Sequence, residues 1–112
     1  MKIVTESISK DELKNIALQM YGDFVKAVVD VERGIMAIGG EMHADEEQVL
    51  LEQGSHQYDL WGINLYPEHE GADFIEFDSM INLRPSQGNR SRSVEDSEMQ
   101  QKIRMLVTRL VK

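Results

Sequence analysis

A regular alternation of apolar and polar side chains over residues 74–84 is the feature that most constrains the fold. Every second position from Ile75 to Leu83 is apolar or small, and all but Met80 of the intervening positions are charged or amide residues. A period of two is typical of a β-strand with one buried and one exposed face. Such a strand belongs to an antiparallel sheet covered on one side. The sequence therefore predicts a strand over 74–84, which Pro85 ends.

The other segments alternate between the two types of regular structure. Apolar and β-branched runs predict strands over 2–5, 24–31, 35–38 and 59–66. Helical spacing of apolar residues predicts helices that start after Ser9, cover 44–53 and cover 94–111, the last with Ser93 and Asp96 at a capping-box-like start. The order β-α-β-β-α-β-β-α predicts an α+β fold with two layers, in which helices cover one face of a mostly antiparallel sheet.

Length and charge limit the class of protein. The chain has 112 residues, enough for one domain over 1–112, with 41% hydrophobic and 29% charged residues, the balance of a globular protein. Its 12 Lys and Arg against 20 Asp and Glu give a formal charge of -8, which argues against binding to nucleic acid or to an acidic membrane. The N-terminus is polar and no apolar run is long enough to span a membrane, so we expect a cytoplasmic protein.

An arginine-rich loop over 84–93 is the strongest candidate for a binding site. It carries three arginines, and no acidic residue occurs between Ser79 and Val94. Arginine suits phosphate and carboxylate oxygens, and a loop that turns its backbone amides inward ahead of a helix adds donors. The residues expected to bind an anion are Arg84, Ser86, Gln87, Gly88, Asn89, Arg90 and Arg92. The alternative is a connecting loop whose arginines pair with the protein's own carboxylates.

Two further groups of residues are candidates for acid-base chemistry. If the strand before Gly39 continued, Glu41, His43 and Asp45 would share one side, as a general base or a divalent metal site would need. No metal-binding motif of known spacing occurs there, so we assign no metal ligand. The polar side of the last two predicted strands offers Asp78 as another candidate base. The catalytic candidates are therefore Glu41, His43 and Asp78, and a solvated polar surface is the alternative for each.

Three stretches resemble a known family. They are VVDVERGIMAIGGEMHADEE, DLWGINLYP and FDSMINLRPSQGNRSR, and with the first and last helices they extend over nearly the whole chain. They are similar to a family of small, mostly bacterial proteins that is catalogued as a domain of unknown function. The resemblance implies a small cytoplasmic protein and transfers no activity, cofactor or catalytic residue.

Two hypotheses of function follow from these residues. The first is a domain, enzymatic or not, that binds a small phosphate- or carboxylate-bearing metabolite through the arginine-rich loop. The second is a non-catalytic protein-interaction module, which includes a homodimer formed through an exposed sheet edge. The sequence names no cofactor for either hypothesis.

Overall fold

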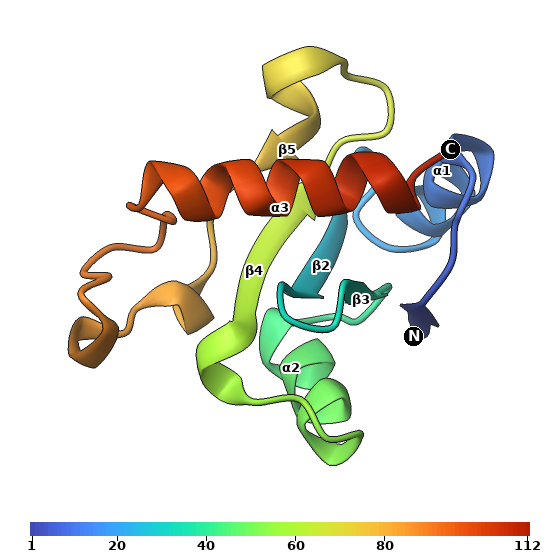
Figure 1. Ribbon diagram of the computed structural model, residues 1–112. Helices are drawn as coiled ribbons and strands as arrows, with labels where there is room; N and C mark the ends of the chain where they lie inside the picture. Colours follow the sequence, from blue (N-terminus) through green and yellow to red (C-terminus); the bar gives the residue numbers. More distant parts are fainter.

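A computed structural model describes all 112 residues of the chain (Figure 1). The five strands are β1 (Lys2–Val4), β2 (Val25–Asp30), β3 (Ile35–Ile38), β4 (Leu60–Leu65) and β5 (Ile75–Glu76). The three α-helices are α1 (Lys10–Gln19), α2 (His43–Glu52) and α3 (Ser97–Leu110). Short 3-10 helices cover Gln57–Asp59, Gly71–Phe74, Met80–Asn82 and Pro85–Gln87. The predicted α+β fold is confirmed.

All five strands form one antiparallel sheet in the order β1-β3-β2-β4-β5. The predicted hairpin joins β2 to β3, and its turn uses Gly34 at a φ of +69°, a conformation that glycine adopts without strain. The longest pairing joins β2 to β4, from Val25 opposite Leu65 to Asp30 opposite Leu60. The pairing of β2 with β4 is therefore the most extensive in the sheet.

The helices cover both faces of the sheet. Alternate residues of β2 and β4, including Val29 and Trp61, pack with α1 and α3 in a core of 18 buried residues. The opposite face carries a smaller cluster in which Leu50 of α2 packs with Val28 and Leu60. Figure 1 shows α3 crossing in front of β4 and β2. The expectation that the helices share one face thus applies to α1 and α3, and α2 covers the other face.

The predicted strand over 74–84 is wrong in its length. Only Ile75 and Glu76 pair with β4, and the chain then leaves the sheet for a 3-10 helix at Met80–Asn82. This segment lies so close to Gly62 of β4 that a Cβ atom added to this glycine would be only 2.5 Å from the Cβ atom of Ser79. The alternating pattern therefore marks a segment that packs closely against the edge of β4 without pairing with it as a strand.

The ends of two helices are set by side chains that accept amide hydrogen bonds. The predicted cap of α1 is confirmed, because Ser9 Oγ accepts from the amide of Glu12 at 3.0 Å. The cap of α3 is Asp96, which accepts from the amide of Glu98 at 2.9 Å, so the helix begins three residues later than residue 94. The residues before Asp96 belong to the preceding loop and not to the helix. None of the helices combines the length and apolar character that crossing a membrane requires.

Candidate functional site

Residues from three of the predicted candidate segments meet in one pocket. The pocket has a volume of about 330 Å³ and lies between the start of α2 and the segment that follows β5. We call it the α2 pocket. Its lining residues are Phe24, Lys26, Met42, His43, Ala44, Asn64, Glu76, Asp78, Ser79, Met80, Ile81 and Arg92. The predicted residues His43, Asp78 and Arg92 are therefore brought together, although they are far apart in the sequence.

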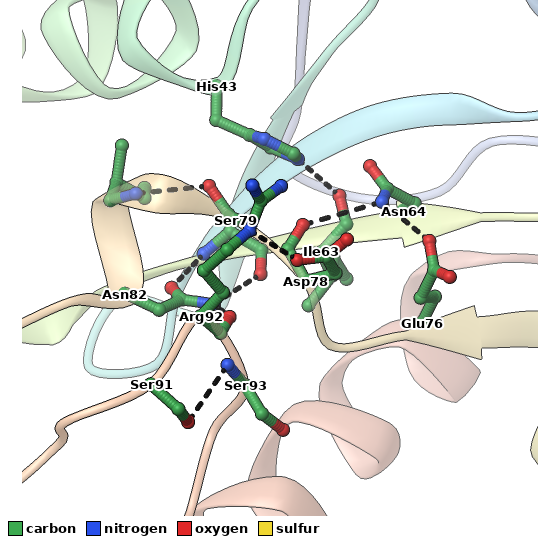
Figure 2. A network of polar contacts seen from close by, with 12 residues as sticks. His43, Ile63, Asn64, Glu76, Asp78, Ser79, Asn82, Ser91, Arg92 and Ser93 are labelled. Carbon is green, nitrogen blue, oxygen red and sulfur yellow. Dashed lines mark hydrogen bonds and ion pairs between the residues drawn. The ribbon is translucent and has the colours of Figure 1, made fainter.

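His43 is the first residue of α2, and its ring is buried against the sheet. Its Nε2 atom donates a hydrogen bond to the carbonyl oxygen of Ile63 at 2.8 Å, as Figure 2 shows. Burial lowers the pKa of His43, and the hydrogen bond to the Ile63 carbonyl offsets this only in part. The imidazole is therefore neutral at pH 7, with Nε2 protonated and Nδ1 free of a proton. This is the state in which a histidine can accept a proton.

Arg92 belongs to the arginine-rich loop and reaches the pocket from the side opposite α2. Its Nε atom donates to Asp78 Oδ1 at 2.7 Å, in an ion pair whose two side chains are about half exposed. In Figure 2 the guanidinium group extends from Asp78 toward the side where His43 lies. The two terminal nitrogens of Arg92 donate no hydrogen bond within the chain. Asp78 thus orients a guanidinium group that keeps donors for a ligand.

Asn64 lies in the floor of the pocket on β4. Its Nδ2 atom donates to Glu76 Oε1 at 2.8 Å and, at 3.4 Å, to the carbonyl oxygen of Asp78. Its Oδ1 atom is buried and has no hydrogen-bond partner. A buried acceptor without a donor costs about 1–3 kcal/mol. A ligand that brings an N–H or O–H group would satisfy it.

Two positive features of the pocket were not predicted from the sequence. Lys26 of β2 is partly buried, forms no ion pair, and holds its Nζ atom 5.0 Å from the centre of the Tyr21 ring. The start of α2 is the second feature, because its N-cap residue Met42 offers no side-chain hydrogen bond to the first turn. Free amides and the helix dipole favour an anion at such an end. A lysine among the apolar residues Val25 and Ala27–Val29 was the signal that could have pointed to Lys26.

A row of aromatic rings beside the pocket was also not predicted from the sequence. Phe24 lines the pocket and stacks on Tyr21 with ring centres 4.8 Å apart. On its other side Phe24 contacts Tyr66, which stacks on His69 at 5.3 Å. These rings come from the ends of α1, β2 and β4, so no local sequence pattern announces the row. Of these rings Phe24 alone lines the pocket, and Tyr21 and Tyr66 pack against it.

Two residues of the arginine-rich loop hold the fold together. The guanidinium group of Arg84 is buried, donates at 2.5 Å to the carbonyl oxygens of Gln57 and Leu60, and lies 4.1 Å from the centre of the Trp61 ring. Asn89 is also buried, and its side chain donates to the carbonyl oxygen of Asn82 at 2.7 Å and accepts from the amide of Glu95 at 2.9 Å. Neither side chain lines the α2 pocket. Their hydrogen bonds serve the protein itself.

The other predicted anion-binding residues lie at the outer end of the loop. Ser86, Gln87, Gly88 and Arg90 are exposed, and none of them lines the pocket. The amides of Gln87, Gly88 and Asn89 donate to carbonyl oxygens within the loop, so they do not form the inward-facing cradle that the sequence suggested. Gly88 has the expected left-handed backbone, with a φ of +79°, and Asn89 does not. Of the predicted set, Arg92 alone reaches the pocket.

Glu41 lies outside the pocket. Its side chain is exposed, and its carbonyl oxygen accepts a hydrogen bond from the Tyr21 hydroxyl. The strand that would have aligned Glu41, His43 and Asp45 ends at Ile38, and α2 begins at His43. The three side chains therefore do not share one side. Nowhere in the chain do three His, Asp or Glu residues lie close enough together to bind a metal ion.

The fold and the pocket define a class: a small α+β domain with a five-stranded antiparallel sheet, helices on both faces and a polar pocket beside an uncapped helix end. The chain belongs to the family described as Protein of unknown function (DUF5674), whose model matches residues 2–110. The predicted membership of an uncharacterised family is thus confirmed, and a bacterial origin stays a prediction. Comparisons with curated proteins and with solved structures found no match.

Proposed function

We propose that the chain binds a small anionic metabolite, bearing a phosphate or a carboxylate, in the α2 pocket. The observation that carries this proposal is that Arg92, Lys26 and the uncapped start of α2 all line one pocket. In a protein with a formal charge of -8, the free donors of Arg92, the Lys26 ammonium and the first amides of α2 are the groups that would bind an anion. Arg92 would form the hydrogen bonds to the anion, and Lys26 would add charge.

The remaining polar groups restrict the ligand further. The unpartnered Oδ1 of Asn64 needs a donor, so the ligand would carry a hydroxyl or amino group as well as its anionic group. Glu76 and Asp78 equal Lys26 and Arg92 in formal charge, which disfavours a polyanion. A hydroxylated carboxylate or a sugar phosphate has the required chemistry. The cytoplasmic location expected from the sequence is consistent with such a ligand and stays a proposal.

If the bound metabolite is transformed, His43 is the residue suited to accept its proton. The imidazole is neutral, lines the pocket and is held in one orientation by the Ile63 carbonyl. Asp78 is better suited to positioning Arg92, because one of its oxygens is engaged in that ion pair. Glu41 has no comparable role, since it lies outside the pocket. We infer binding as the function, and chemistry at His43 as its extension.

The test is a thermal-shift screen with inorganic phosphate, glycerol 3-phosphate and malate, repeated on three variants. A ligand at about 100 times its dissociation constant stabilises the folded state by about 2.7 kcal/mol. We expect the shift to disappear in Arg92→Gln and to weaken in Lys26→Met. Arg90→Gln is the matched control, because Arg90 lies in the same loop, is exposed and does not line the pocket.

Each outcome separates the hypotheses. Loss of the shift in Arg90→Gln with retention in Arg92→Gln would overturn the pocket and favour the outer loop as the anion site. A shift that all three variants keep would place the ligand elsewhere. No shift with any compound would favour the protein-interaction module, and sedimentation of the purified chain would then show whether it forms a homodimer.

A further inference from the structure

A second cavity lies on the opposite face of the sheet from the α2 pocket. It has a volume of about 740 Å³ and lies between α3, the start of α1 and the segment that leads into β5. We call it the α3 groove. Its lining residues are Lys10, Glu70, Gly71, Ala72, Phe74, Ile75, Arg104, Val107, Thr108 and Val111. No residue is shared with the α2 pocket.

The bottom of the α3 groove is apolar. Val107 of α3 and Ile75 of β5 are buried members of the main core, and Phe74 and Val111 pack partly buried against it. An apolar floor bordered by a few polar groups is the usual composition of a small-molecule site. The size of the groove lies in the range of about 300–1,000 Å³ that is typical of small-molecule sites. The apolar floor therefore calls for an apolar body in whatever binds there.

Two cations border this floor. The Nζ atom of Lys10 lies 5.4 Å from the centre of the Phe74 ring, and the guanidinium carbon of Arg104 lies 5.0 Å from the centre of the Phe77 ring. Neither cation forms an ion pair, although acidic residues outnumber basic ones 20 to 12 in the chain. Contacts with aromatic rings hold the two charged groups in place but leave them uncompensated. Glu70 is the one acidic residue that lines the groove.

We propose that the α3 groove binds an organic monoanion with an apolar body, of the class of medium-chain carboxylates. The carboxylate would pair with Lys10 or Arg104, the two cations that line the groove, and the hydrocarbon chain would cover Phe74, Ile75, Val107 and Val111. The two charges select an anion over a neutral or cationic amphiphile of the same length. Burial of the hydrocarbon chain against the apolar floor supplies most of the affinity.

The test compares decanoate with two molecules that share its chain, decanol and decylammonium, by amide chemical-shift mapping of the 15N-labelled chain. We expect decanoate to shift the amides of Ala72, Ile75 and Val107 and to bind at least tenfold more tightly than either control. Ala72→Trp should block the groove, because Ala72 is an exposed residue of its wall and tolerates a larger side chain.

Charge is tested separately. Lys10→Gln combined with Arg104→Gln should reduce decanoate affinity to that of decanol, whereas Lys102→Gln, an exposed cation elsewhere on α3, should leave it unchanged. Arg92→Gln should also leave it unchanged, so that failure of the α2 pocket and failure of the α3 groove are distinguishable. Equal binding of decanoate and decanol would overturn the proposal. So would a groove closed by a second copy of the chain, which sedimentation would reveal as a dimer that decanoate does not dissociate.

Discussion

The side-chain amide of Asn82 pairs with both backbone groups of Gly62. Asn82 Oδ1 accepts from the Gly62 amide at 2.8 Å, and Asn82 Nδ2 donates to the Gly62 carbonyl oxygen at 2.9 Å. These are the bonds that a neighbouring strand would make, and β5 has already ended at Glu76. Asn82 Nδ2 also donates to the carbonyl oxygen of Arg92 at 2.9 Å. One buried amide therefore completes the edge of β4 and fixes the backbone that carries Arg92 into the α2 pocket.

We predict that Asn82→Asp lowers the free energy of unfolding by about 2–4 kcal/mol. The aspartate keeps the acceptor for the Gly62 amide but loses the donor, so the carbonyl oxygens of Gly62 and Arg92 face a buried carboxylate. Urea denaturation of the variant measures the loss, and Ser86→Ala, at an exposed position nearby, serves as the control. If Asn82→Asp lost no more free energy of unfolding than Ser86→Ala, water would have replaced the hydrogen bonds of the Asn82 side-chain amide.

The strands and helices whose apolar residues recur at regular spacing could be predicted from the sequence. Alternation in β2 and β4 places Val29 and Trp61 in the main core, and the Ser9 cap fixes the start of α1. The segment after β5 could not be predicted in this way. Its alternation is real, yet Ser79 and Asn82 are buried because they pack against Gly62, an approach that depends on a glycine in another strand. Local periodicity does not report such a contact.

The candidate site, like the fold, could be predicted only in part from the sequence. His43, Asp78 and Arg92 were identified by residue type, because imidazole, carboxylate and guanidinium groups carry chemistry wherever they lie. Arg84 was identified for the same reason, and the structure instead places it over Trp61 with its donors on backbone carbonyls. Only the tertiary fold distinguishes an arginine that completes the end of a strand from one that reaches a pocket.

A buried carboxyl group makes stability depend on pH. Glu46 of α2 is fully buried, its Oε2 atom accepts from the Gly40 amide at 2.9 Å, and its Oε1 atom has no partner. Burial raises the pKa of Glu46 to about 9. The folded protein therefore keeps a proton that the unfolded chain releases above its ordinary pKa of 4.5. Glu46 therefore contributes fully to the free energy of unfolding below pH 4.5. This contribution is progressively lost as the pH rises toward about 9.

We predict that Glu46→Gln removes this loss, because glutamine stays neutral and can still accept from the Gly40 amide. The difference in unfolding free energy between the variant and the natural chain should grow in favour of the variant from about pH 6 to about pH 8, by up to about 1.4 kcal/mol for each pH unit. Urea denaturation at several pH values measures it. Glu47→Gln, on the neighbouring and less buried residue, is the control. A difference independent of pH would show that Glu46 is ionised in the folded protein.

His43 makes the free energy of unfolding depend on pH in the opposite direction, at acid pH. Burial lowers its pKa below the ordinary value of 6.5, so the unfolded chain binds a proton that the folded protein does not. Stability therefore falls as the pH decreases below about 6.5. Glutamine can replace the Nε2 donor toward the Ile63 carbonyl and does not titrate. We predict that His43→Gln is less sensitive than the natural chain to a change from about pH 7 to about pH 5.

The imidazole signals in a proton NMR titration provide the direct measurement. His43→Gln identifies the resonance of His43 among the three histidines, and that resonance should titrate below 6.5. The same titration with glycerol 3-phosphate tests the α2 pocket, because an anion beside the ring stabilises the imidazolium and should raise the pKa of His43. An increase that is absent in Arg92→Gln would place the anion between these two residues. An unchanged His43 titration in the presence of a bound ligand would remove His43 from the site and leave Arg92 and Lys26 as its binding groups.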